Sequence, residues 1–356
     1  MSSEKSTMNI HDFIPSTVTE NLLRNYLLNM VPASVPTPKN DEEKIKFKML
    51  NNFFTEVYLN MLYQPNDYLL AQYSVADGKE NNQHKSIATY KLKHGLIGFY
   101  GLFLLGEVFE SNKIIVNYET WKKWYDSHGI PKSLKSVVKP VEFFKGFKNI
   151  GMDIKVDEMI TVSADGSIVS FLSEFAKHTL NKGDCDSFVR CDTRVLTDEP
   201  NEFSYRDLSW TLKSEDAETF LQYVQYAINA GYKLTYKHGI DVSGIFSYKG
   251  QTVCGFNVSS GDFRIRIIYN KINEPLEQSK EFINFFEQKV IPGFGPCDKS
   301  CGDSCYFKQI KEPTEVIIGN KKYFLCSGGY YFGKPAKSIL DYYFHFIKMR
   351  ENAIKS

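Results

Sequence analysis

The sequence predicts an α+β protein in which a helical N-terminal region precedes two similar antiparallel α+β units and a cysteine-rich hairpin–helix tail. Two observations predict this class. Up to about residue 135, apolar residues recur every three or four positions, a spacing typical of amphipathic helices. From about residue 150 onward they alternate with polar residues instead, which is typical of half-buried strands.

These patterns divide the chain into five segments. They are an N-terminal arm with a proline-rich linker (1–40), a helical region (41–135), a first α+β unit (136–200), a second α+β unit (201–290) and a cysteine-rich segment ending in a helix (291–356). At roughly 150 residues per domain, a chain of 356 residues suits two domains or one large one. Because 42% of the residues are hydrophobic and 15% aromatic, a disordered chain is excluded.

The arm and the segment after it carry helix signals. Thr17 and Glu20 have the capping-box spacing that begins a helix, and prolines 32, 36 and 38 then form a stiff linker. We expect the arm helix to cover its own domain, with docking to a partner as the alternative. Residues 45–62 place apolar side chains on one helical face and stop before Pro65, which predicts a buried helix.

An apolar helix that contains glycines is predicted over residues 86–109. Each of its four glycines costs about 1 kcal/mol in a helix interior, which predicts either close helix packing or a break near Gly95. The apolar run is shorter than the roughly 20 residues of a membrane span, so we interpret it as a core helix. A short helix over residues 120–128 follows, with Trp121 and Trp124 on one face.

Two segments resemble each other and suggest an internal repeat. FKNIGMDIKV (147–156) and AINAGYKLTY (227–236) both pass from a helix end through Asn-x-Gly into a strand pattern. In the first copy, a hairpin is predicted next over residues 159–172 and a further strand over 187–196. In the second copy, the hairpin is predicted over 240–256 and the strand over 262–270. A true duplication predicts two packed units with a cleft between them, and chance similarity of two hairpins is the alternative.

Four cysteines of the tail form the strongest candidate site. Cys297, Cys301 and Cys305 share a glycine-rich loop after a helix predicted over 277–290, and Cys326 ends a hairpin. Four thiolates suit a tetrahedral Zn²⁺ ion in a structural role. The CxxxCxxxC spacing differs from the common CxxC knuckle, so an iron–sulfur cluster, unligated thiols and a labile disulfide stay as alternatives.

The hairpin is expected to turn at Gly319-Asn320, and a last helix is predicted over residues 336–353. Between them, the segment from Gly328 to Lys334 nearly matches the phosphate-binding loop GxxxxGK[ST]. However, Pro335 replaces the hydroxyl residue that would hold Mg²⁺. We therefore interpret this segment as a turn that leads into the last helix.

Charge and cysteine usage narrow the partners and the compartment. The 43 basic residues balance the 42 acidic ones and only seven are arginines, so nucleic acid is disfavoured as the principal partner, although a local basic patch stays open. We expect no membrane insertion. The first residues lack the apolar core of a secretion signal, and seven cysteines in such a chain favour reduced thiols or metal ligands. A cytoplasmic location is expected.

These observations together favour a cytoplasmic binding or regulatory protein. It would hold a small molecule or a protein partner and carry a structural metal at the four cysteines. The histidines show neither HxxxH nor HExxH spacing, and no hydrolase triad is recognisable. The alternative is an enzyme whose site assembles from distant residues, such as Cys191 or Cys254 with His178 or His238. An iron–sulfur protein is a further alternative.

Overall fold

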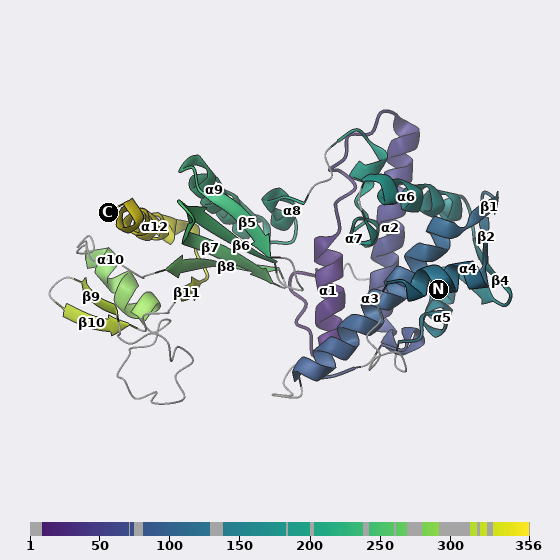
Figure 1. Ribbon diagram of the computed structural model, residues 1–356, viewed down its shortest axis with the longest axis horizontal. Coiled ribbons are helices and arrows are strands. Elements are labelled where there is room, and N and C mark those ends of the chain that lie inside the picture. Colours follow the sequence, from purple (N-terminus) through teal and green to yellow (C-terminus); the bar gives the residue numbers. More distant parts are fainter. Residues whose placement is uncertain are drawn as a thin grey trace. The chain divides into compact units, whose positions relative to one another are not determined.

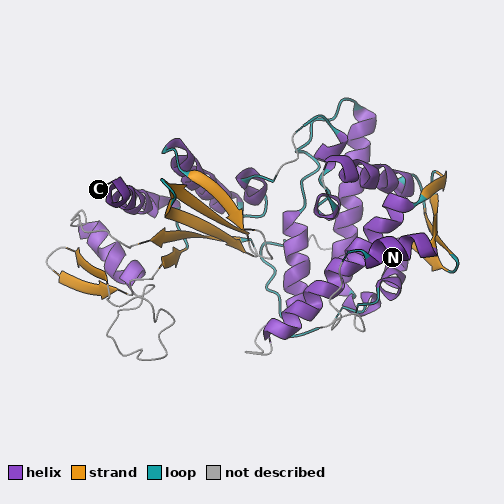
Figure 2. Ribbon diagram, in the orientation of Figure 1, coloured by secondary structure: helices purple, strands orange, loops and turns teal. Residues whose placement is uncertain are grey.

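The computed structural model describes residues 9–70, 72–74, 81–128, 138–182, 184–199, 203–237, 242–259, 261–268, 280–291, 314–318, 321–325 and 330–355. The chain forms two compact units, Met1–Trp210 (unit 1) and Thr211–Ser356 (unit 2). The predicted α+β class is confirmed, because helices dominate the N-terminal region and all the described sheets are antiparallel (Figures 1 and 2). The finer division into five segments stays a prediction.

Unit 1 is mostly helical and has an aromatic core. Its longer described helices are α1 (Val18–Asn29), α2 (Asp41–Tyr63), α3 (Asn81–Leu105), α4 (Tyr118–Asp126) and α6 (Ile168–Lys182). Its shorter ones are η1 (Pro65–Tyr68), α5 (Pro140–Phe143), η4 (Phe144–Ile150), α7 (Cys185–Val189), η5 (Thr193–Leu196) and α8 (Tyr205–Ser209). Phe54 of α2 and Phe99 of α3 both contact Phe188 of α7, with ring centroids 5.2 and 6.4 Å away. The core therefore joins segments that are far apart in the sequence.

The predicted signals at the helix ends are confirmed in α1 and α2. Thr17 accepts a hydrogen bond from the backbone N–H of Glu20, whose carboxylate accepts one from the N–H of Thr17 in return. Asn40 caps α2 by accepting from the N–H of Glu43, and the helix ends at Tyr63, before Pro65. Because these caps satisfy backbone groups that the helix leaves unpaired, they fix where each helix begins.

The glycines of α3 serve close packing, and the helix runs without a break at Gly95. A Cβ atom at Gly95 would lie 2.6 Å from the ring of Phe143, and one at Gly101 would overlap the ring of Trp124. The prediction was wrong at the C-terminal end, because α3 stops at Leu105. Residues 107–117 form a hairpin instead, since Ile114 and Val116 alternate with exposed or half-buried residues and are themselves buried.

The sheet of unit 1 has four antiparallel strands in the order β1-β2-β4-β3. They are β1 (Glu107–Glu110), β2 (Lys113–Asn117), β3 (Met152–Val156) and β4 (Met159–Ala164). The hairpin predicted over 159–172 is wrong, because α6 begins at Ile168 after β4 and a turn. Val169, Leu172 and Phe175 are all fully buried, and their helical spacing, rather than strand alternation, decides the structure there.

The strand predicted over 187–196 is also wrong. This segment holds most of α7, a left-handed residue at Cys191 (φ 53°) and η5. Asp184 caps α7 by accepting a hydrogen bond from the N–H of Ser187, and the N–H of Asp192 closes the helix by donating to the Ser187 carbonyl. These local hydrogen bonds satisfy the backbone without a partner strand.

Unit 2 is built on a five-stranded antiparallel sheet in the order β11-β8-β7-β6-β5, with β5 at one edge. The strands are β5 (Lys233–Lys237), β6 (Val242–Tyr248), β7 (Gln251–Ser259), β8 (Asp262–Ile268) and β11 (Tyr330–Gly333). The hairpin predicted over 240–256 is confirmed in β6 and β7, which turn through the left-handed residues Lys249 and Gly250. Helix α9 (Ser214–Asn229) lies along this sheet, where Phe220 contacts Phe256 and Phe263 (Figure 1).

The similarity between the two predicted repeats is limited to one helix end and one hairpin. Gly151 and Gly231 both end a helix in the left-handed conformation, with φ of 79° and 81°. The strand after each one, β3 or β5, pairs with the next strand in the chain. Beyond that point the copies differ, because α6 follows β4 whereas β7 follows β6.

The tail contains the elements predicted for it. β9 (Thr314–Ile318) and β10 (Lys321–Leu325) pair with Ile318 opposite Lys321, and the two turn residues between them lie outside the described residues. α10 (Lys280–Phe285) continues into a π-helical turn, η6 (Phe286–Val290). The last helix, α12 (Leu340–Lys355), follows a short 3₁₀ turn, η8 (Lys337–Ile339).

The described residues contain no helix that is both long and apolar enough to cross a lipid bilayer. The apolar run that is too short for a membrane span lies in α3, and its residues Phe99, Leu102 and Phe103 are almost fully buried inside unit 1.

Replacing Gly101 by alanine should lower the free energy of unfolding by about 1 kcal/mol or more, because the cost of overpacking against Trp124 exceeds the helix propensity that alanine gains. Urea unfolding of G101A, W124L and the double variant measures this. With Trp124 removed, the alanine should cost little or stabilise the protein. An equal loss with and without Trp124 would show that the ring does not require the glycine.

Candidate functional site

The predicted metal site lies outside the part of the chain that the structure describes. Cys297, Cys301 and Cys305 fall in residues 292–313, and Cys326 falls in 326–329. Among the described residues, no group of three or more His, Cys, Asp or Glu side chains could hold a metal ion. Zinc at the four cysteines therefore stays a prediction.

The two thiols considered for catalysis are buried and weakly acidic. Cys191 is 1% exposed, and burial together with the charge of Asp192 raises the pKa of its thiol. Burial raises the pKa of Cys254 to about 12. A thiol is nucleophilic as the thiolate, so these environments disfavour reaction. The ring of His178 hydrogen-bonds the carbonyl of Glu174 on its own helix, and His238 lies outside the described residues.

The segment that resembles a phosphate-binding loop does not form one in its described part. Tyr330–Gly333 is the strand β11, which pairs with β8 from Tyr330 opposite Ile268 to Gly333 opposite Ile265. Lys334 extends to Asp262, with its Nζ 2.7 Å from the carboxylate. The lysine therefore has an acidic partner within the protein, and the strand replaces the loop that would wrap a phosphate.

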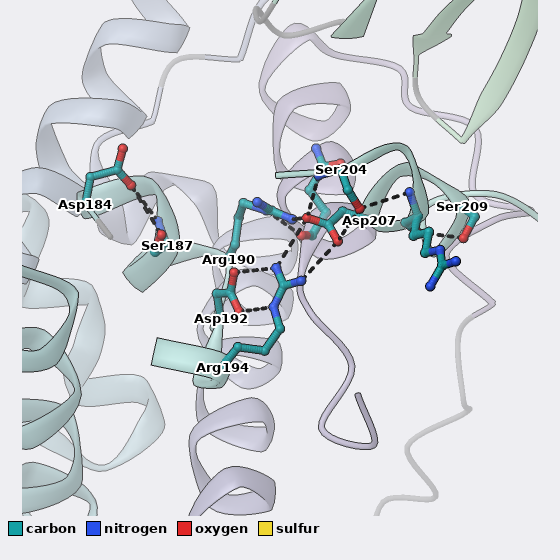
Figure 3. Close-up of polar contacts among 10 residues, drawn as sticks. Asp184, Ser187, Arg190, Asp192, Arg194, Ser204, Asp207 and Ser209 are labelled. Carbon is teal, nitrogen blue, oxygen red and sulfur yellow. Dashed lines mark hydrogen bonds and ion pairs between the residues drawn. The ribbon is translucent and has the colours of Figure 1, made fainter. Parts of the chain in front are cut away.

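The most concentrated group of buried charges is an arginine–aspartate cluster in unit 1, which we call the clasp: Arg190, Asp192, Arg194 and Asp207 (Figure 3). Arg194 donates to both carboxylate oxygens of Asp192 at 2.7 and 2.6 Å. It also donates to both oxygens of Asp207 at 3.2 and 3.3 Å. Asp192 is fully buried and Asp207 is 3% exposed, so the clasp is a structural cross-link between η5 and α8.

The charges of the clasp compensate one another. Burial alone would lower the pKa of Arg194, but its hydrogen bonds to Asp192 and Asp207 outweigh that effect and raise it. Arg190 reaches Asp207 at 3.5 Å and also donates to the carbonyl of Asn29 at the end of α1. Two arginines and two aspartates balance in charge, so neither an anion nor a cation is called for.

A small concave site that opens to solvent lies elsewhere in unit 1, between η1, α3 and α5. We call it the lysine hollow. Its walls are mainly apolar, and its two charged groups are ammonium groups. The residues that line it are Tyr68, Leu69, Lys91, Gly95, Lys139, Pro140 and Phe143. Ligand sites commonly combine apolar walls with a few polar groups in this way.

Local structure places each lysine at the lysine hollow. Leu69 ends η1 with a left-handed backbone (φ 51°, ψ 28°), which a bulky residue adopts only under constraint. The Nζ of Lys91, on α3, donates to the Leu69 carbonyl at 3.3 Å. Lys139 precedes α5 and lies 3.3 Å from Glu142. The absence of a Cβ at Gly95 lets Phe143 approach α3 and form one wall.

Electrostatics distinguish the two lysines. Lys139 is exposed and has a carboxylate partner, whereas burial lowers the pKa of Lys91 and the nearby charge of Lys139 lowers it further. No described carboxylate forms an ion pair with Lys91. A half-buried cation beside a second cation is unfavourable unless an anion compensates it. Lys91 therefore gives the lysine hollow a positive charge that no described carboxylate compensates directly.

A second uncompensated polar pair lies between α3 and α4. The Nδ1 of His94 and the hydroxyl of Tyr125 are both buried and have no hydrogen-bond partner among the described residues. Their rings meet edge to face with centroids 6.0 Å apart. Burial lowers the pKa of His94 to about 4, and the charges of Lys93 and His128 act in the same direction. His94 is therefore neutral at physiological pH.

Neither of these sites is recognisable in the sequence. Lys91 and Lys139 belong to segments that only the fold brings together, and single lysines carry no motif. His94 stood among scattered histidines with no ligand spacing.

No protein-family model matches the chain, and neither the curated proteins nor the solved structures include a significant match to it. The chemistry of its own residues is therefore the basis for assigning a function.

Replacing Arg194 by methionine should destabilise the protein by about 3–5 kcal/mol, because two carboxylates would stay buried without their cation. Removing the exposed Lys39–Asp198 pair with D198N should cost less than about 1 kcal/mol. Urea unfolding measures both variants. Similar small losses in the two would contradict a structural role for the clasp.

Stability should fall as the pH falls from 6.5 to about 4, because His94 takes up a proton more readily in the unfolded chain than in the folded one. The shift corresponds to roughly 3 kcal/mol, fully present above pH 6.5 and lost by pH 4. Urea unfolding across this range should show a shallower pH dependence for H94F than for the wild type. H178Q is the matched control, and an unchanged slope in H94F would contradict the assignment.

Proposed function

We propose that this protein is a small-molecule binding protein whose unit 1 takes a small anion in the lysine hollow. The observation that carries the proposal is Lys91, a half-buried cation whose described hydrogen-bond partner is a carbonyl and whose charged neighbour is a second lysine. An anion between the two ammonium groups would remove their repulsion and offset the cost of burying Lys91.

Size and wall chemistry limit the ligand class. The enclosed space of the lysine hollow is only about 10 Å³, roughly the room for one water molecule, so a ligand would bind at its open mouth and would have to be small. Lysine offers a compact charge rather than a planar fork, so it suits phosphate or carboxylate without bidentate geometry. Inorganic phosphate and short carboxylates such as acetate are therefore the appropriate probes.

Substituting Lys91 or Lys139 by methionine should weaken phosphate or acetate binding about tenfold, the effect of losing roughly 1.4 kcal/mol. Titration calorimetry and NMR chemical-shift titration measure this, with K177M on the exposed face of α6 as the matched control. K91M should keep or raise stability, because it removes a desolvated cation. If the wild type binds neither probe, or K177M weakens binding equally, the proposal fails.

The pH dependence of binding has a defined sign. In the protein without a bound anion, the pKa of Lys91 lies below its usual 10.5. A bound anion would favour the charged form of the lysine. Affinity should therefore fall as the pH rises toward 10.5, and binding should be accompanied by proton uptake in that range.

We also propose, from the sequence, that Cys297, Cys301, Cys305 and Cys326 bind a structural Zn²⁺ ion. Elemental analysis of protein purified without oxygen should find about one zinc per chain. C301S should lose the metal, whereas C185S, which alters a cysteine of α7, should keep it. A metal-free wild type would contradict the site. A brown protein that contains iron would indicate an iron–sulfur cluster in place of zinc. The cytoplasmic location proposed here rests on the same reduced cysteines.

A further inference from the structure

The sheet of unit 2 has two faces of opposite character. Along β8, Phe263, Ile265 and Ile267 are buried on the face that α9 covers, and the residues between them are Arg264 and Arg266. The register of the strands places further residues on the arginine side, which we call the basic sheet face. They are Lys233, Thr235, Lys237, Ser243, Ile245, Ser247, Gly255, Asn257 and Asp262.

One row of this face crosses four strands. Lys237 pairs with Ser243, Ser243 with Asn257, and Asn257 with Arg264. Asn257 donates to the hydroxyl of Ser243 at 3.1 Å, so the middle of the row is a flat, neutral floor of small polar groups. Lys237 and Arg264 are both exposed at its ends. Three strand intervals separate these two cations by about 14 Å.

The charge of the basic sheet face is one-sided. Three exposed cations, Lys233, Lys237 and Arg264, lie on this face, and the one acid among its described residues, Asp262, already pairs with Lys334. Solvent-facing sheet surfaces ordinarily mix both signs, and the whole chain is balanced at 43 basic and 42 acidic residues. Unit 2 carries 19 of those bases against 15 acids, so the excess of positive charge belongs to this unit.

We propose that the basic sheet face binds an extended acidic segment of a partner protein. An extended chain advances about 3.4 Å per residue, so carboxylates four residues apart span the about 14 Å between Lys237 and Arg264. The hydroxyls and the amide between them can hydrogen-bond the backbone of the segment. Single-stranded nucleic acid is the competing ligand, and the balance of 43 basic and 42 acidic residues in the chain disfavours it.

The test uses the full-length protein and a fluorescent peptide of about twelve residues in which every fourth residue is Glu and the others are Ser and Gly. Fluorescence anisotropy at low salt should show binding by the wild type. The double variant K237E/R264E should bind at least about tenfold more weakly, because each change replaces attraction by repulsion. K280E is the matched control, since it reverses an exposed charge of α10 in the same unit.

Each outcome decides the proposal. Loss of binding in K237E/R264E with less than about twofold change in K280E supports it, provided that both variants unfold like the wild type in urea. Equal losses in the two variants would indicate non-specific attraction and overturn it. Tighter binding of an oligouridylate of equal charge would overturn it in favour of nucleic acid. Because the lysine hollow lies in unit 1, phosphate binding there should be the same in all three proteins.

Discussion

The burial of two carboxylates in the interior of unit 1 depends on Arg194, which lies between them and is assisted at Asp207 by Arg190. Asp192 and Asp207 would each be costly to bury alone, and the guanidinium satisfies both. The segment that these ion pairs hold in place also takes part in the core of unit 1. Phe188, two residues before Arg190 of the clasp, is a central ring of the aromatic core. The carbonyls of Val189 and Arg190 accept hydrogen bonds from Tyr58 and Val31. The clasp thus connects α8 to the packing of α1, α2 and α3.

The lysine hollow shows the opposite use of charge. Arg194 makes four hydrogen bonds to two carboxylates, whereas Lys91 is partly desolvated and lies beside another cation. A protein that only needed stability would place an apolar side chain there, because an unpaired half-buried ammonium group costs free energy. Groups retained at such a cost are concentrated at functional sites. This contrast within one unit is the reason for assigning a structural role to the clasp and for proposing a ligand at the lysine hollow.

Sequence patterns predicted the parts of the fold that depend on local chemistry. The capping box at Thr17, the buried stripe of α2 and the turn at Lys249-Gly250 each have a cause within a few residues. The errors at 159–172 and 187–196 have a common origin. Both segments were predicted from strand patterns, but after β4 the turn at Asp165-Gly166 leads into helix α6 rather than into a second strand. The buried residues Val169 and Leu172 are three positions apart, a spacing that indicates a helix rather than a strand.

The edge strand β5 affects whether separate copies of this chain can associate through their sheets. Its outer backbone groups have no neighbouring strand in the described sheet, which is the arrangement that lets sheets of separate molecules join. Lys233 and Lys237 stand at the two ends of this strand and are exposed. If two such edges approached antiparallel, ammonium groups of one copy would face those of the other. Their repulsion opposes continuous sheet growth, so the same lysines protect the protein against aggregation.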